Sequence, residues 1–597
     1  MKYPTLESLS TSREMVDIFA GYNHNLRIGD GEFYDMKNLT SDSYPVLSPR
    51  HKRGTYALTD NPQGMIVKDA LCYIDGKKFY INKYPVPGEL NNSVPKTLVS
   101  MGSYVIIMPD KVYVNTANAC NAEDVKALEL KRIEVTNTST EYVTFSHCKL
   151  DGTEYEDVPL SDTAPENPEN EQYWIDTSDT PHVLKQYSTT NNMWVAVATT
   201  YIKIYSPQIG LGLSVGDGVT ISGIVKSEVA DLNGTMIVQG CGENEVIVTG
   251  ILTKFVTQTE PITIKRQMPD MDFIIESENR LWGCRYGVAV NGEVVNEIYA
   301  SKLGDFKNWN CFAGISTDSY AATVGTDGQF TGAITHLGYP IFFKENCMHK
   351  VYGNYPANYQ IQTTACRGVQ KGCSKSLAIV NETLFYKSRS AICAYDGSLP
   401  TEVSSALGDV GYSNAVAGAL GNKYYISMMG GIDEGEVNEA VYNLFVFDTK
   451  RGMWHKEDNT RVVEFCNYRG NLCYIDYADR HIKTVRGGAG EDGDIDTAPV
   501  EWMAETGIIG TDSPDKKYIS RIDVRMSLTF GAKVYFYVEY DSEEGWEHLY
   551  TMAGTTLKSF AVPIRPKRCD HLRLRIVGEG DAKIYSICKT IEQGSDM

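Results

Sequence analysis

Short apolar runs separated by tight-turn residues recur along much of the chain. In residues 271–312, the apolar run at 273–275 is followed by the turn residues Glu278 and Asn279, and a second turn carries Asn291-Gly292. Two apolar runs joined by such a turn are typical of a β-hairpin. We therefore expect residues 271–312 to form two hairpins, which is the content of one blade of a β-propeller.

The same hairpin rhythm fills residues 64–116, stops, and returns in residues 333–486. Its period is roughly forty to fifty residues, which is typical of propeller repeats. We expect about six to eight blades, which share a pattern and not a sequence. Buried tryptophans are expected to anchor individual blades, namely Trp282, Trp309 and Trp454.

Residues 117–265 interrupt this rhythm. Segment 151–180 holds ten acidic residues and neither lysine nor arginine, and it includes a run of proline, glutamate and asparagine at 165–170. We interpret 117–265 as one or more small β-domains looped out of the propeller. Trp174 and Trp194 form either the core of such a small domain or a surface on which a sugar ring stacks.

The two ends of the chain differ from the propeller. Residues 1–63 are interpreted as an extended arm, with the pattern of one short helix in 10–20. Residues 487–498 are rich in glycine and aspartate, which is typical of a linker. In 499–597, apolar and polar residues alternate along several stretches, and this period of two predicts the strands of a β-sandwich.

The predicted fold class is therefore all-β: a β-propeller with inserted small β-domains and a C-terminal β-sandwich. The expected boundaries are 1–63 for the N-terminal arm, 64–116 for the first propeller hairpins, 117–265 for the inserted domains, 266–486 for the remaining blades, 487–498 for the linker and 499–597 for the sandwich.

Charge and cysteine usage restrict the classes of function. The chain has 597 residues, a formal net charge of −20 and 14 cysteines. The acidic excess opposes tight, non-specific binding to duplex DNA, which needs clustered lysine and arginine. No C-x-x-C pair occurs, so we expect reduced thiols, no metal site and no cofactor. The first residues lack the apolar stretch of a signal peptide and no apolar run is long enough to span a bilayer, so we expect cytoplasmic synthesis without membrane insertion.

No familiar catalytic spacing is present. The chain lacks G-x-S-x-G, H-E-x-x-H and P-loop motifs, and only 10 residues are histidine. We accordingly expect no catalytic residue and no enzyme activity. The abundant carboxylates leave a glycosidase pair open, since two carboxylates suffice for that chemistry.

Basic residues of the arm and of the sandwich are candidate docking positions for acidic neighbours or phosphate. Arg50, Lys52 and Arg53 cluster in the arm. The alternating sandwich strands place further arginines on an outer face, namely Arg521, Arg525, Arg573 and Arg575. The alternative for each of them is a solvated surface.

Three parts of the chain resemble tail-hub, or nozzle, proteins of tailed bacteriophages. They are Asn279-Arg280-Leu281-Trp282 with Tyr299-Ala300-Ser301 and Gly304-Asp305-Phe306 through Trp309, then Met36-Lys37-Asn38-Leu39-Thr40 with Tyr44-Pro45 and Arg50, and finally Pro566-Lys567-Arg568 with His571-Leu572-Arg573-Leu574. The resemblance implies a homo-hexameric ring below the portal and adaptor of a virion tail. It also implies contacts with tail fibres or other tail proteins, and DNA passing through the channel without sequence-specific binding.

Two functions follow from the sequence. The first, implied by the resemblance, is a structural hub or nozzle of a phage tail, located in the virion and made in the host bacterial cytoplasm. The second is a carbohydrate-binding or carbohydrate-cleaving β-propeller, such as a receptor-binding protein or a glycosidase. The tryptophans and acidic clusters favour this second function.

Overall fold

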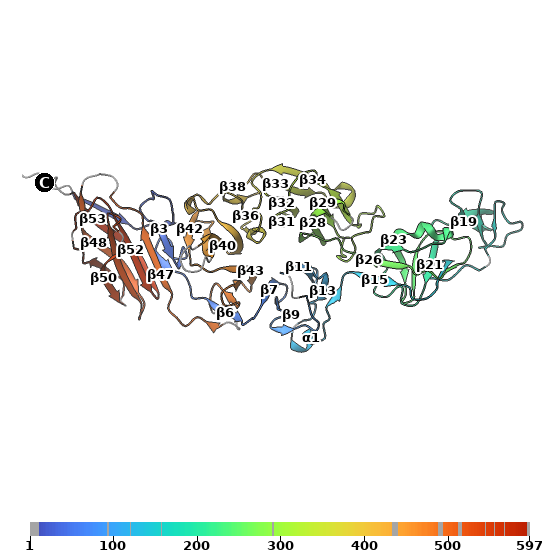
Figure 1. Cartoon of the computed structure of the whole chain (residues 1–597), viewed down its shortest axis with the longest axis horizontal. Coiled ribbons are helices and arrows are strands. Elements are labelled where there is room, and N and C mark those ends of the chain that lie inside the picture. Colours follow the sequence, from blue (N-terminus) through green and yellow to red (C-terminus); the bar gives the residue numbers. More distant parts are fainter. Residues whose placement is uncertain are drawn as a thin grey trace, which may run out of the picture.

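The computed structural model describes residues 11–91, 95–119, 121–156, 158–288, 292–432, 440–487, 494–510, 516–543, 545–553, 556–565 and 567–593. These residues form mainly β-strands, with helical structure in α1 (Ala122–Lys126) and in the 3₁₀ turns η1 (Ser227–Leu232), η2 (Pro356–Asn358), η3 (Ser374–Ser376) and η4 (Ser405–Leu407). The molecule is elongated: a β-sandwich lies at one end, a propeller in the middle and the inserted domains at the other end (Figure 1). The predicted all-β fold class is confirmed.

Seven four-stranded blades form a ring within the described residues. Contacts between first strands run around the ring, through η3 between the fourth and fifth blades, and join the last blade to the first. The number of blades lies within the expected range. In blade order the strands are β7 (Pro62–Val67), β8 (Leu71–Asp75), β9 (Lys78–Ile81), β10 (Tyr84–Pro85); β11 (Thr97–Met101), β12 (Tyr104–Met108), β13 (Val112–Asn115), β14 (Lys131–Arg132); β27 (Phe273–Ser277), β28 (Arg280–Val288), β29 (Val294–Ala300), β30 (Tyr320–Thr323); β31 (Gly332–His336), β32 (Tyr339–Lys344), β33 (Cys347–Tyr352), β34 (Gln360–Ala365); β35 (Ala378–Val380), β36 (Thr383–Lys387), β37 (Ile392–Tyr395), β38 (Thr401–Glu402); β39 (Ser413–Leu420), β40 (Lys423–Ile432), β41 (Ala440–Asp448), β42 (Met453–Lys456); and β43 (Val462–Tyr468), β44 (Asn471–Asp476), β45 (Ile482–Thr484) with β6 (Gly54–Ala57).

The second strand of a blade reads as a continuous apolar run because neighbouring blades cover both of its faces. In β12, Val105, Ile106 and Ile107 are fully buried although their side chains alternate between faces. Val105 and Ile107 pack towards the first blade, whereas Ile106 packs with Trp309 and Phe306 of the third. This two-sided burial explains why the blade pattern in the sequence is a short apolar run and not a strict alternation.

Strand β6 closes the ring. It comes from the N-terminal part of the chain and pairs antiparallel with β45, with Thr484 opposite Gly54 and Lys483 opposite Thr55. A further strand, β46 (Asp494–Ile495), pairs with the other side of β6. The last blade therefore contains strands from both ends of the propeller, and opening the ring requires breaking this pairing.

The interpretation of residues 1–63 as an extended arm is corrected by the structure, in which strands of the described part of this segment belong to four sheets. The strands involved are β1 (Thr11–Val16), β2 (Gly21–Tyr22), β3 (Glu32–Lys37), β4 (Leu39–Thr40), β5 (Ser48–Pro49) and β6. The helix predicted in 10–20 was wrong, because Thr11–Val16 hydrogen-bonds along the last strand of the chain, with Thr11 opposite Glu592. Because the two paired strands lie at opposite ends of the chain, the residues around Thr11–Val16 give no local sequence signal for this pairing.

The C-terminal region is a two-sheet sandwich, as predicted. Its strands are β47 (Glu501–Thr506), β48 (Lys517–Leu528), β49 (Lys533–Tyr540), β50 (Glu547–Ala553), β51 (Lys558–Val562), β52 (Leu572–Glu579) and β53 (Ala582–Gln593). One sheet has the order β1-β53-β48-β51. The other continues through β3 and β2 into the sixth blade, giving the ten-strand order β39-β40-β41-β42-β2-β3-β47-β52-β49-β50. The sandwich and the propeller thus share one hydrogen-bonded sheet.

The insertion begins later than the predicted residue 117, because α1 and β14 complete the second blade. Its larger part is an eight-stranded sheet with the order β15-β26-β22-β23-β24-β21-β16-β25 around an apolar core. These strands are β15 (Val135–Thr138), β16 (Val143–Cys148), β21 (Tyr201–Tyr205), β22 (Gly218–Ser222), β23 (Gly234–Cys241), β24 (Glu245–Thr249), β25 (Val256–Gln258) and β26 (Thr263–Arg266). A small four-stranded subdomain follows β16 and forms the tip of the molecule: β17 (Leu160–Ser161), β18 (Tyr173–Asp176), β19 (Val183–Ser188) and β20 (Met193–Ala196) (Figure 1).

A buried polar network fixes the insertion to the third blade. Arg266 donates to Asp217 at 2.5 Å, and both side chains are buried. Asn308, in the third blade, donates to the same aspartate at 2.9 Å and accepts from the backbone N–H of Gly218. Each member of this network therefore has a hydrogen-bond partner, as buried polar groups in folded proteins generally do.

The three tryptophans predicted to anchor blades are buried: Trp282 is 2% exposed, Trp309 3% and Trp454 2%. Trp282 packs edge-on against Tyr359 of the next blade, with ring centroids 5.0 Å apart. The indole N–H groups of Trp309 and Trp454 donate to Phe306 and Val403 backbone carbonyls at 2.8 Å.

Residues 488–493 of the predicted linker lie outside the described residues. The 13 described cysteines are free thiols, most of them buried, in agreement with the expectation of reduced cysteines. Among the described residues, none of the helices combines the length and apolar character that a bilayer crossing needs.

Candidate functional site

Arg50 and Arg53, predicted as surface docking residues, belong to an internal ion-pair network. Arg53 contacts Glu457 at 2.8 Å and Asp458 at 2.9 Å, and its side chain is 7% exposed. Arg50 lies 3.7 Å from each of the same carboxylates. Both arginines are therefore committed to joining the N-terminal segment to the sixth blade.

Lys52 lies at the side of this network and donates to the backbone carbonyl of Thr497 at 3.0 Å. It lines a 450 Å³ cavity between the propeller and the sandwich, together with Arg50, Arg53 and Glu501. The cavity is bordered by the segment that joins the two domains, so Lys52 is best described as part of this junction.

The four sandwich arginines do not share one face. Arg521 and Arg525 lie on the outer side of β48, whereas Arg573 and Arg575 lie on the outer side of β52 in the opposite sheet. Arg573 pairs with Glu505 and Glu539, and Arg575 pairs with Glu505 at 2.6 Å and stacks over Trp546. These contacts hold the strands of one sheet together, because the partners lie on β47 and β49.

Within the propeller ring, Glu464 on β43 is a carboxylate with partners inside the chain and a shifted pKa. It lies 3.3 Å from the Lys375 ammonium and accepts from the backbone N–H of Met65. Burial raises the pKa of Glu464 above its usual range. These contacts link the seventh blade to the first blade and to η3, which is a structural role.

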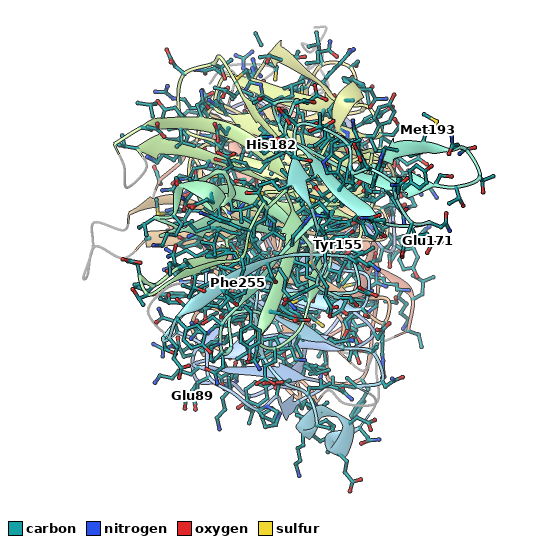
Figure 2. The ribbon with its side chains drawn as sticks, turned by 90° about the vertical axis from the view of Figure 1, so that its right-hand side faces the viewer. Glu89, Tyr155, Glu171, His182, Met193 and Phe255 are labelled. Carbon is teal, nitrogen blue, oxygen red and sulfur yellow. The ribbon has the colours of Figure 1, made fainter. Side chains whose placement is uncertain are left out.

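A cleft in the insertion is lined by aromatic and polar side chains whose hydrogen-bonding capacity is not fully satisfied by contacts within the chain. It lies where the eight-stranded sheet meets the tip subdomain, and it has a volume of about 140 Å³. Figure 2 views the molecule from this end and labels Tyr155 and Phe255, two aromatic residues of the lining. The lining residues are Ser146, His147, Glu154, Tyr155, Val158, Ile175, Leu252, Thr253, Lys254 and Phe255.

A local turn brings the polar residues of this cleft together. Strand β16 ends at Cys148, and the backbone reverses through Asp151 and Gly152, with Gly152 at a φ of +84° that glycine adopts readily. The returning chain pairs Glu154 with Cys148, and the Tyr155 N–H donates to the His147 carbonyl at 3.1 Å. Glu154 and Tyr155 are thereby held beside the end of β16.

The electrostatic state of the cleft at neutral pH follows from these contacts. Burial lowers the pKa of His147 to about 4, so its imidazole is neutral, and its Nε2 has no hydrogen-bond partner. Hydrogen bonds from Lys203 and Ser146 lower the pKa of Glu154, so its carboxylate is charged. Burial raises the pKa of Tyr155 to about 12, so its phenol keeps its proton. The side chains lining the cleft thus include a neutral imidazole, a phenol that keeps its proton and a charged carboxylate.

Aromatic rings extend from the cleft into the tip subdomain. The Tyr155 ring lies 4.8 Å from both the His147 and the Tyr173 ring centroids. Trp174 is 4% exposed and donates its indole N–H to Ser161, so it forms the core of the tip and leaves no face free for a sugar. Trp194 packs edge-on against Trp174 at 5.4 Å and is half-buried.

Sequence reasoning singled out the two tryptophans and missed His147, Glu154, Tyr155 and Phe255. One signal was present in β16, where Val143 and Phe145 are buried and alternation places His147 on their side of the strand. A histidine that continues an apolar face can line a cleft at the end of the strand. The contribution of Phe255, more than a hundred residues later, had no such signal.

No group of three or more potential metal ligands of the histidine, cysteine, aspartate or glutamate types occurs in the part of the chain that the structure describes. The cleft itself contains one carboxylate and one imidazole among its lining residues. Its chemistry is that of hydrogen bonding and ring stacking.

Comparisons with known proteins found similar folds and no sequence relatives. No protein-family model matches the chain. No curated protein matches it either. Among solved structures, an exo-β-1,3-galactanase from Phanerochaete chrysosporium matches 53% of this chain and 94% of its own, with 8% identity and a TM-score of 0.22. An acylaminoacyl peptidase from Pyrococcus horikoshii matches 49% and 47%, with 11% identity and a TM-score of 0.22. The protein YjhT matches 52% and 93%, with 12% identity and a TM-score of 0.23.

The expectation of a structural tail component without enzyme activity is contradicted, because glycoside hydrolases and a peptidase are among the similar structures. At such identities and TM-scores the likeness shows a fold alone and transfers no residue, so a function has to be argued from the site. The resemblance to tail-hub proteins, the hexamer and the tail partners stay predictions.

Proposed function

We propose that this chain is a carbohydrate-binding β-propeller protein, and that the cleft at His147, Glu154 and Tyr155 holds the sugar. The observation that carries the proposal is the meeting of aromatic rings and unsatisfied or charged polar groups in one cleft at the end of an elongated molecule. The propeller and sandwich then serve as the support that projects this cleft.

The chemistry of a sugar fits this lining. A pyranose ring has an apolar C–H face and a rim of hydroxyls, each of which donates and accepts hydrogen bonds. Tyr155 and Phe255 supply aromatic surface for the C–H face. The Glu154 carboxylate accepts from hydroxyls, and a charge-assisted hydrogen bond of this kind is roughly twice as strong as a neutral one. His147 also lines the cleft, and its buried Nε2 has no hydrogen-bond partner within the chain.

The size of the cleft sets the kind of sugar. Its volume of about 140 Å³ is below the roughly 300–1,000 Å³ of a pocket that encloses a drug-sized ligand. Phe255 is 62% exposed at its mouth. We therefore expect recognition of a terminal sugar unit, with the rest of the chain extending into solvent.

A glycan array tests the proposal directly. The full chain is labelled and applied to an array of terminal mono- and oligosaccharides, beside the variants Glu154→Gln and Glu171→Gln. Glu171 serves as the matched control because it lies on the tip and outside the cleft lining. We expect a restricted set of glycans to be bound by the unaltered chain and the Glu171 variant, and a loss of about tenfold or more for the Glu154 variant.

The outcome that contradicts the proposal is an array without signal above background, or equal binding by both glutamate variants. Each bound glycan is also incubated with the chain and its products are separated, because glycoside hydrolases are among the similar structures. Release of a sugar would add cleavage to the binding proposed here.

A further inference from the structure

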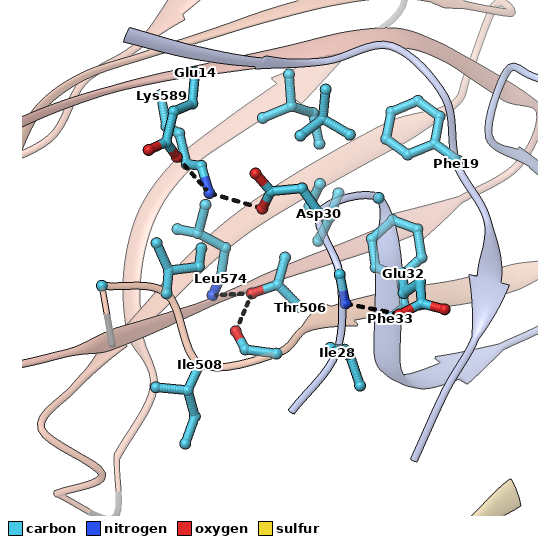
Figure 3. A pocket seen from close by; sticks show the side chains of 18 of the residues that line it. Glu14, Phe19, Ile28, Asp30, Glu32, Phe33, Thr506, Ile508, Leu574 and Lys589 are labelled. Carbon is cyan, nitrogen blue, oxygen red and sulfur yellow. Dashed lines mark hydrogen bonds and ion pairs between the residues drawn. The ribbon is translucent and has the colours of Figure 1, made fainter. Parts of the chain in front are cut away.

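The C-terminal sandwich contains a further cavity, which is separate from the proposed carbohydrate site. It has a volume of about 260 Å³ and lies between the two sheets, where β1 and the loop before β3 cover one edge (Figure 3). Its lining comes from β1, β3, β52, β53 and the segment after β47. Segments from both ends of the chain are therefore needed to build it.

The inner wall of this cavity is apolar. Its buried lining residues are Phe19, Phe33, Leu574, Ile576, Ile587 and Ile591. Ile508, at the mouth, is 44% exposed and leaves an apolar edge open to solvent. An apolar pocket with a few polar groups at its mouth is the usual form of a small-molecule site.

Glycines hold the covering loop close to the sandwich. Gly31 has a φ of +88°, and a Cβ on it would lie 2.2 Å from the Ile18 carbonyl oxygen. A Cβ on Gly507 would lie 2.5 Å from Ile28. A Cβ on Gly31 would strike the backbone and one on Gly507 would displace the Ile28 side chain, so both glycines allow the close approach of the segments at this edge.

The charged groups at the mouth are mainly acidic. Lys589 is 7% exposed and pairs with Glu14 at 3.0 Å and Asp30 at 2.9 Å, as the dashed lines in Figure 3 show. Glu32 lines the same mouth and accepts hydrogen bonds from Asn23 and the Gly29 N–H. The charged lining residues are three carboxylates and one ammonium, which gives the cavity lining a formal charge of −2.

We propose that this cavity binds a small amphipathic amine, with its apolar body between the sheets and its ammonium group among Glu14, Asp30 and Glu32. The lysine neutralises one carboxylate, and a second cation at the mouth neutralises another. Burial of the apolar body removes hydrocarbon from water, which supplies the affinity. The carboxylates select the sign of the charge, because a like charge at this mouth is repelled.

A matched series of ligands tests the sign and the site together. Hexylamine, hexan-1-ol and hexanoate share one apolar chain and differ in head group, and their binding to the full chain is measured by ligand-observed NMR at neutral pH. We expect hexylamine to bind about tenfold more tightly than hexanoate, with hexan-1-ol between them. Equal or tighter binding of hexanoate would overturn the proposal, and so would the absence of binding by all three.

Two variants locate the binding. Glu14→Gln keeps the shape of the mouth and removes one carboxylate, whose side chain is 35% exposed. Glu579→Gln, at the far end of β52 and outside the cavity lining, is the matched control. We expect hexylamine binding to weaken about threefold to fivefold in the first variant and to be unchanged in the second. Equal weakening in both, or no change in either, would place the amine elsewhere and contradict the assignment.

Discussion

At the scale of single residues, burial decides what a side chain does in this molecule. Arg53 and Arg573 carry the charge that suggested docking surfaces, yet each is paired with carboxylates of its own chain. His147 lies in a cleft with a free ring nitrogen, and nothing in its sequence neighbourhood marked it as chemical. Charge can be predicted from a sequence, whereas the partner that uses the charge depends on contacts between distant segments.

Trp282 provides a residue-scale prediction of stability. Its ring is 2% exposed and packs against Tyr320 and Tyr359, so Trp282→Ala leaves a cavity between two blades. We expect the free energy of unfolding to fall by about 3–5 kcal/mol. Urea denaturation followed by circular dichroism measures this change, with Tyr142→Ala as a control because Tyr142 is 55% exposed. An unchanged denaturation midpoint for the Trp282 variant would contradict the anchoring role.

His349 gives a residue-scale prediction for pH. It is fully buried between Thr326 and Thr363, and burial lowers the pKa of His349 to about 4, with the Lys344 charge acting in the same direction. The unfolded chain, with a histidine pKa of about 6.5, therefore binds a proton that the folded chain does not between pH 6.5 and 4. The stabilisation is present above pH 6.5 and is lost as the pH falls towards 4.

The expected loss from this single group is at most about 3 kcal/mol. Denaturation of the unaltered chain and of His349→Gln at a series of pH values isolates it from the carboxylates, which titrate in the same acidic range. The variant should show a smaller fall in unfolding free energy between pH 6.5 and 4. An identical pH dependence of the two proteins would show that folding does not change the pKa of His349, and would contradict this account.

At the scale of elements, the sequence predicted the propeller from its two-residue turns and short apolar runs, because these patterns are local. It missed the outer strands β10 and β14, each of two residues, since so short a strand has no pattern of its own. It also missed β1, β2, β3 and β6, each of which has a partner strand more than four hundred residues away. Pairing over such distances can be seen only in the folded chain.

The closing strand β6 can be tested as an element. Thr55 lies between β45 and β46, and Thr55→Pro removes a backbone donor and fixes φ within this pairing. We expect about 3 kcal/mol or more to be lost from the free energy of unfolding. Thr55→Ala is the matched control, because it changes the side chain and keeps the backbone N–H. Equal stability of the two variants in chemical denaturation would indicate that the ring does not depend on β6.

At the scale of the whole molecule, continuous structure connects the sandwich at one end to the candidate sugar cleft at the other. The ten-stranded sheet joins the sandwich to the propeller, and the hydrogen bonds of Asn308 in the third blade to Asp217 and Gly218 join the propeller to the insertion. The tip subdomain and its cleft therefore project from a connected body (Figure 1). This arrangement suits a protein that presents a binding site at a distance from its base.

Calorimetric titration of the full chain with a glycan identified on the array tests the central claim most directly. Two tyrosines of the insertion are compared: Tyr155 lines the cleft, whereas Tyr142 lies outside its lining. The account predicts that Tyr155→Ala weakens binding by about tenfold or more through the loss of its ring, and that Tyr142→Ala binds like the unaltered chain. Unchanged affinity of a folded Tyr155 variant, or an equal loss in the Tyr142 variant, would contradict the claim that this cleft holds the sugar.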